Sequence, residues 1–298
     1  MRHGLFRSLG TPEGAPYVRQ SSPHAARVAP SYVGRGFSRA AFSYVGRRFS
    51  GAALVLALAT TLVAQPLDRL TGKVLTERGE PLKDVDVRIE ALFGFAGSDF
   101  LGQRTFTART SAKGDWALLG LKSGIWIFDV SPSGQVPDAI ALPFFLVSPA
   151  GSGVNGIVPV WHPILRPTPL PSGEIGQLLA DAADAARAGR PDKATPLLAL
   201  LSAFTDANVL TAAGRICLLM RDPTVARPFF RRALEKDPTS FRAALGMGSS
   251  ALMQRDVDAA ARAFGDARDR TKDKDERSYL SAAINELNKA HNVMRGTY

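Results

Sequence analysis

Histidine and cysteine, the side chains that most often carry acid–base, nucleophilic or metal chemistry near neutral pH, are scarce in this 298-residue chain. Only His162 and His291 follow residue 65, and Cys217 is the one cysteine. Neither histidine has a further ligand at the spacing of a zinc or iron site. A Ser-His-Asp arrangement would need one of the two, and neither ends a strand where a cleft forms. The sequence therefore predicts no metal site and no catalytic residues.

Other motifs that carry chemistry are also missing. The chain has no Gly-x-Ser-x-Gly elbow, no phosphate loop and no dinucleotide fingerprint, and the glycines at 94–97 and 151–153 belong to loops. A lone cysteine cannot form an intramolecular disulfide, so we expect Cys217 to be a small buried apolar residue. We expect no cofactor, and a binding protein rather than an enzyme.

The net charge of +10 is unevenly distributed. Residues 1–64 hold eight arginines, no lysine and one acid, Glu13, whereas the remainder holds 29 basic and 26 acidic residues. A nearly balanced surface gives little electrostatic reason to bind a phosphate backbone, so no nucleic-acid partner is expected.

An apolar run at 51–64 is typical of an export signal. It contains no charge, follows Arg47 and Arg48, and ends at Ala64, after which cleavage before Gln65 is expected. Its 14 residues are too few to span a bilayer comfortably, which takes about 20. The alternatives are an uncleaved anchor and a buried core helix. The sequence thus predicts a protein exported from a bacterial-type cell to the periplasm, surface or medium.

The residues before this run have the composition of a disordered extension. Residues 1–46 are rich in Arg, Ser, Gly and Pro, and 31–42 are nearly repeated at 43–54. Our hypothesis is that translation begins downstream, near Val45. Independently of the start site, we assign residues 1–64 to a disordered extension and a signal peptide rather than to a domain.

Short strands separated by glycine turns are expected at 66–150. Residues 84–90 alternate strictly, with Val85, Val87 and Ile89 on one face, and further strands are expected at 70–76, 104–110, 116–119 and 125–130. Trp116 and Trp126 lie on these strands and are expected in the core. The pattern predicts an all-β sandwich.

The order of these pieces resembles the carboxypeptidase regulatory-like, or transthyretin-like, domain. The matching segments are Gly72-Lys-Val74, Gly79-Glu-Pro-Leu82, Val85-Asp-Val87, Thr110, Gly114-Asp-Trp116 and Gly120-Leu-Lys-Ser-Gly124. The resemblance covers about 70 residues and implies a Greek-key sandwich that is an accessory without catalysis. An insertion at 92–104 carries Phe93, Phe95 and Phe100, which would either cover the open end of the sandwich or form an interaction patch.

A proline-rich linker is expected at 151–172. Proline fixes φ and removes a backbone donor, so the five prolines of this segment disfavour a helix or a central strand. We expect a semi-stiff connector, with a last edge strand at 157–161.

A 34-residue period dominates 173–298. Asp222, Ala226, Phe230 and Ala233 recur 34 residues later, and a weaker copy begins at Gly189. Each unit would be two antiparallel helices, in which small residues allow close approach and phenylalanines fill the gaps between units. A last helix at 275–295 has one apolar face and looks like a terminal cap, with Asp273-Lys-Asp-Glu276 at its start as a capping box.

This pattern resembles the tetratricopeptide repeat family, with units at 175–206, 207–240 and 241–274. The fold class is therefore multidomain: an all-β Greek-key sandwich plus an all-α tetratricopeptide solenoid. The family binds peptides or proteins through the inner face made by the first helix of each unit. Transferred to this chain, that face contains Asn208, Thr211, Arg215, Arg242, Leu245 and Ser249. One subgroup clamps C-terminal carboxylates from this face, and at the matching positions only Arg215 keeps a suitable charge.

Two functions remain open from the sequence. The first is an exported scaffold or adaptor that binds a protein or peptide in the repeat groove. The second is an envelope- or carbohydrate-binding module that uses the loops of the sandwich and their aromatic residues.

Overall fold

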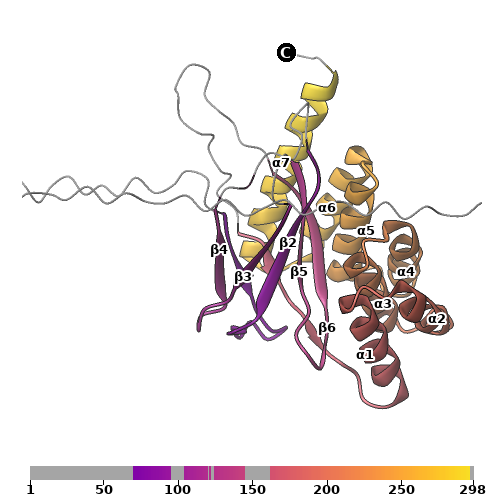
Figure 1. Ribbon diagram of the computed structural model, residues 1–298. Helices are drawn as coiled ribbons and strands as arrows, with labels where there is room; N and C mark the ends of the chain where they lie inside the picture. Colours follow the sequence, from indigo (N-terminus) through magenta and orange to yellow (C-terminus); the bar gives the residue numbers. More distant parts are fainter. Residues whose placement is uncertain (1–69, 95–103, 120, 122–123, 145–161, 296–298) are drawn as a thin grey trace, which may run out of the picture. The chain divides into compact units, whose positions relative to one another are not determined.

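The computed structural model describes residues 70–94, 104–119, 121, 124–144 and 162–295, with the side chains of the last helix up to Lys289. These residues form nine strands followed by seven helices (Figure 1). The strands are β1 Leu70–Val74, β2 Asp86–Gly94, β3 Thr105–Arg109, β4 Asp115–Leu118, β5 Gly124–Val130, β6 Gln135–Val136, β7 Asp138–Phe144, β8 Ile164–Leu165 and β9 Thr168–Pro169. The helices are α1 Glu174–Arg187, α2 Pro191–Leu201, α3 Ala207–Leu219, α4 Pro223–Lys236, α5 Phe241–Met253, α6 Val257–Arg270 and α7 Lys274–Arg295. The expected signal at 51–64 and the expected strand at 157–161 lie outside the described residues.

The strands form a three-stranded sheet in the order β4-β1-β8, a four-stranded sheet in the order β3-β2-β5-β7, and the pair β6-β9. The first five strands lie where the sequence predicts them. The two larger sheets share one apolar cluster, in which the Trp116 ring on β4 lies 5.8 Å from the Phe128 ring on β5. Both tryptophans, Trp116 and Trp126, are buried as expected.

Strand β5 is buried along its whole length because both of its faces are covered. Successive side chains of a strand point to opposite faces. Trp126 and Phe128 contact Phe106 of β3 and Trp116 of β4, whereas Ile127 belongs to the cluster formed with helices α1 to α4. The four-stranded sheet is therefore a middle layer between the smaller sheet and the helices.

The described part of the expected linker belongs to the sheets. Ile164 and Leu165 pair in parallel with Lys73 and Val74 of β1, and Thr168–Pro169 pairs with β6. Proline is tolerated here because both pairs are two residues long and lie at sheet edges. The segment 162–170 thus connects the two parts of the chain and also completes the β part.

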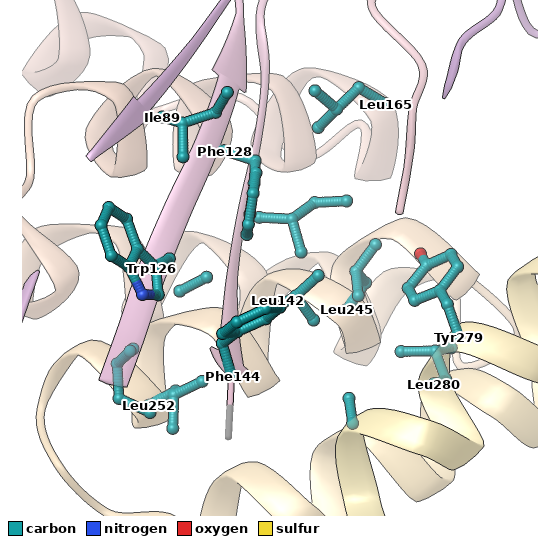
Figure 2. Close-up of a cluster of buried hydrophobic side chains, with 14 of the residues drawn as sticks. Ile89, Trp126, Phe128, Leu142, Phe144, Leu165, Leu245, Leu252, Tyr279 and Leu280 are labelled. Carbon is teal, nitrogen blue, oxygen red and sulfur yellow. The ribbon is translucent and has the colours of Figure 1, made fainter. Parts of the chain in front are cut away.

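The β part and the helices share their cores. Strand β7 packs against α3, α5 and α7, and side chains from all these layers meet in the clusters of which Figure 2 shows one. The residues labelled there come from β2, β5, β7, the β8 strand, α5 and α7: Ile89, Trp126, Phe128, Leu142, Phe144, Leu165, Leu245, Leu252, Tyr279 and Leu280. The sequence predicts two domains joined by a connector, and the structure shows them in continuous apolar contact.

Helices α3 to α6 begin at residues whose side chains cap them. The carboxylates of Asp206, Asp222 and Asp256 and the hydroxyl of Ser240 accept backbone N–H groups at the starts of α3, α4, α6 and α5. Within the described residues, no helix combines the length and the apolar composition needed to cross a membrane.

The helices approach closely where the repeat carries glycine. A Cβ added to Gly246 of α5 would lie 2.3 Å from the Phe230 ring of α4, and one added to Gly248 would lie 2.4 Å from the Phe264 ring of α6. The phenylalanines of α4 and α6 therefore occupy the space left by glycines of the first helices. This confirms the roles expected for the small and large positions of the repeat.

Replacing Gly246 by alanine should therefore lower the free energy of unfolding by about 1–3 kcal/mol, because a rigid buried ring must move. Gly265 of α6 is the matched control, since a Cβ there meets nothing within 4 Å. Gly265→Ala should leave stability unchanged or raise it by up to about 1 kcal/mol through helix propensity. Urea unfolding of the two variants measures the difference. Equal effects would contradict the proposed packing.

Candidate functional site

The inner face of the helical repeats is covered in part by strand β7 of the same chain. β7 is an edge strand, so its outward N–H groups need partners outside the sheet. The Ala141 N–H donates to the Ser249 hydroxyl of α5 at 3.2 Å, and Pro143, two residues further along the same edge, has no N–H. Leu245 and Ser249, both expected in an open groove, are buried under this strand. For these two residues the expectation of an open groove is not met.

A buried carboxylate fixes the start of β7 to the inner face. Asp138 is 2% exposed, and its two oxygens lie 3.1 Å from Arg215 Nη2 of α3 and 3.3 Å from Arg242 Nη1 of α5. It also accepts the Arg166 backbone N–H at 2.6 Å. Burial lowers the pKa of Arg215 to about 10, and Asp138 partly offsets this effect. A buried charge is tolerated only when it is paired and hydrogen-bonded, and these contacts provide both.

Arg166 extends the same network to the last helix. Its guanidinium pairs with Glu276 at 2.8 Å and with Asp273 at 2.5 Å, and it donates to the Thr76 carbonyl. Asp273 also caps α7 through the N–H groups of residues 275 and 276, as the sequence predicts. The Glu276 carboxylate accepts from Arg166 and Thr271, so the reciprocal half of the expected capping box is replaced by contacts to other elements.

Two arginines at equivalent repeat positions hold the turns between helices against the sheet. Arg221 and Arg255 are 34 residues apart, and each has a φ of 63°. Gly189 has the same φ in the first unit, where glycine adopts it without strain. Left-handed backbone costs other residues about 1–2 kcal/mol. The contacts that each arginine side chain makes with the four-stranded sheet explain why arginine occupies this strained position.

Arg221 reaches two carboxylates of the four-stranded sheet. Its Nη2 lies 2.9 Å from Glu90 of β2 and 2.6 Å from Asp129 of β5. Burial raises the pKa of Asp129, and the Arg221 cation opposes that rise.

Arg255 stacks its guanidinium over the Phe93 ring at 4.6 Å from the centroid, at the end of β2. Phe93 is therefore engaged within the chain. Phe95 and Phe100, the other two aromatic residues expected either to cover the open end of the sandwich or to form an interaction patch, lie outside the described residues.

Beyond the start of β7, the inner face is hollowed by a cavity of about 490 Å³. Four of the six expected binding residues line it: Asn208, Thr211, Arg215 and Arg242. Its other walls are α1, the β6-β9 pair and the turn after β1, represented by Ile175, Leu179, Val136, Pro169 and Glu77. The volume falls within the range of roughly 300–1,000 Å³ used by small-molecule sites.

The polar groups of this cavity differ in how they are engaged. Thr211 donates its hydroxyl to the Ala207 carbonyl of its own helix, whereas Asn208 is exposed. Arg215 uses both terminal nitrogens for Asp138, Thr168 and the Arg166 carbonyl, but its buried Nε has no partner among the described residues. Nε is therefore the one nitrogen of this guanidinium that lacks an acceptor among the described residues.

The described part of the chain supports neither a metal site nor a reactive thiol. It holds no group of three or more His, Cys, Asp or Glu side chains able to bind a metal ion. His162 lies beside β1, where its Nδ1 is 2.6 Å from the Thr71 hydroxyl. Cys217 is buried as expected, and burial raises its pKa to about 12, far from the range of a reactive thiolate.

No protein-family model and no curated protein sequence matches this chain. Among solved structures, it is similar to the first TPR domain of human RPAP3, with 12% identity over 42% of this chain and 97% of that one and a TM-score of 0.35. It is similar at 16% identity, over 42% and 97%, to the Yersinia enterocolitica type III secretion chaperone SycD in complex with a peptide of the translocator YopD, with a TM-score of 0.35. A putative carbohydrate-binding protein of Pseudomonas aeruginosa matches at 12% identity over 33% and 87%, with a TM-score of 0.22. Similarities at this level do not define a function.

Removing the Ser249 hydroxyl should leave the Ala141 N–H of β7 buried without an acceptor. We expect Ser249→Ala to lower the free energy of unfolding by about 1–3 kcal/mol. Ser250→Ala is the matched control, because the buried Ser250 hydroxyl bonds only the Gly246 carbonyl of its own helix. Its effect should stay below about 1 kcal/mol. Chemical denaturation measures both, and a Ser250→Ala effect as large as that of Ser249→Ala would contradict this role.

Arg221→Met should lower the free energy of unfolding by about 2–4 kcal/mol at pH 7, because Asp129 loses its cation while it stays buried. The variant keeps a side chain of similar length at the same strained backbone position. Loss of the cation raises the pKa of Asp129 further. As the pH falls through that raised pKa, the folded state binds a proton before the unfolded state does, so the deficit should shrink towards pH 4.

The control for this prediction is Arg88→Met, which removes an exposed pair with the same Glu90 and should cost less than about 1 kcal/mol. Urea unfolding at several pH values measures both variants. A deficit for Arg221→Met that stays constant from pH 7 to pH 4 would contradict the assigned role of Asp129.

Proposed function

We propose that this protein is a non-catalytic adaptor that binds a peptide in the cavity at the open end of its helical-repeat inner face. The observation that carries the proposal is the position of the cavity. The chain's own β7 covers Leu245 and Ser249, and the adjoining part of the same face, with Asn208, Arg215 and Arg242, remains hollow.

The rigid setting of the cavity supports this function. Its arginines are held by Asp138 and its walls come from both the β part and the helices, so the site exists before a ligand arrives. A preformed site loses less conformational entropy on binding than a flexible one. The β part thus serves the adaptor as one wall of its binding site.

Two further proposals concern the family of the β part and the location of the protein. We propose that the β part is a carboxypeptidase regulatory-like domain with Greek-key connections, on the sequence motifs that match that family. We also propose that the protein is exported through the apolar run at 51–64, on the composition of that run and its preceding arginines.

Crosslinking from inside the cavity tests the proposed function. A photoreactive residue at Asn208, whose exposed side chain lines the cavity, should crosslink to a discrete partner segment in the native host. The same residue at Arg262, exposed on α6, is the control and should not give that product.

The identified segment is then synthesised and titrated onto the full chain. Asn208→Trp should fill the cavity and weaken its binding by at least about tenfold, whereas Arg262→Trp should not change it. Binding that is indifferent to Asn208→Trp would overturn the cavity as the site.

A further inference from the structure

The charged side chains around the cavity differ in how deeply they are buried. Arg215, 4% exposed, lies at the bottom with its Nε unpartnered, and Arg242 is half-buried beside it. Asp138 is the carboxylate that pairs with both arginines, so the two cations share one anion. The bottom of the cavity therefore favours a ligand group that accepts hydrogen bonds and carries negative charge.

The rim of the same cavity is negative. Glu77, in the turn after β1, and Asp206, before α3, are both exposed and line the cavity. One oxygen of Asp206 accepts the N–H groups of residues 208 and 209. The Glu77 carboxylate has no hydrogen bond or ion pair among the described residues. A purely anionic ligand would meet these two carboxylates on its way in.

The wall between bottom and rim is aliphatic. Ile175 and Leu179 of α1 and Val209 and Ala212 of α3 face the cavity, together with Val136 of β6. A purely polar ligand would leave this wall in contact with water, and a purely apolar one would leave the Arg215 Nε without an acceptor. Each simple class of ligand thus fails to match part of the lining.

We propose that the cavity binds a small zwitterion, namely a short aliphatic peptide with both ends free. Its carboxylate binds Arg215 and Arg242 at the bottom, its ammonium group lies near Glu77 and Asp206 at the rim, and its side chains pack on Ile175 and Leu179. This inference rests on the proposed function, since it uses the same cavity, and it narrows the peptide to one of about two residues. A free aliphatic amino acid shares this chemistry and is the other source of such a ligand.

Titration calorimetry on the full chain tests the inference with defined probes. They are an equimolar set of Ala-Ala, Val-Val and Leu-Leu, the same dipeptides acetylated at the amino end and amidated at the carboxyl end, and free leucine. The unblocked dipeptides should bind and the doubly blocked ones should bind at least about tenfold more weakly, because both charged contacts are lost.

A matched pair of variants in one turn tests the rim. Glu77→Gln should weaken binding of the unblocked dipeptides by roughly three- to tenfold and leave the blocked ones unchanged. Glu80→Gln, exposed in the same turn but absent from the lining, should change neither.

The outcomes separate this inference from the proposed function. Blocked dipeptides that bind as well as free ones would overturn the zwitterion and leave a peptide site. No binding of any probe would also overturn it, and crosslinking from Asn208 then decides the proposed function independently. Leucine binding as tightly as the dipeptides would support the zwitterion and identify an amino acid as its source.

Discussion

The buried carboxylate of Asp138, held between Arg215 and Arg242, is the interaction on which the arrangement of this protein depends. Asp138 and Arg215 are almost fully buried and Arg242 is half-buried, and among the described residues none of the three has another ion-pair partner. Such a cluster is stable in one register only, since a shift of β7 by one residue would turn the carboxylate away from the helices. It therefore determines where the strand lies on the repeats and where the cavity begins.

Strand β7 limits how much of the inner face of the repeats a partner can reach. A solenoid with an empty groove would offer its whole length to an extended partner. Here the part of the groove along α5 is filled by a strand that is also hydrogen-bonded along β5, so it cannot leave without disrupting the sheet. What remains for a ligand is a bounded cavity, which favours a short ligand over a long one.

The sequence predicted the elements better than their assembly. Alternation and glycine turns identified the first five strands, and the 34-residue period identified the helices and the fit of Phe230 and Phe264 against glycines. Strand β7 was missed because it is buried on both faces and reads as an unpatterned apolar run. Four of the six expected binding residues line the cavity. Leu245 and Ser249 are covered by a strand that lies far from them in the sequence. Local residue spacing cannot predict such a contact.

The strained arginines at the repeat turns have a consequence for how the chain can be divided. In a fragment that held only the helices, Arg221 and Arg255 would keep their unfavourable backbone angles but lose Glu90, Asp129 and Phe93. The face that β7 covers would be exposed to water at the same time. The repeats of this chain are thus an incomplete folding unit, and a terminal boundary placed near residue 173 would cut through a single cooperative structure.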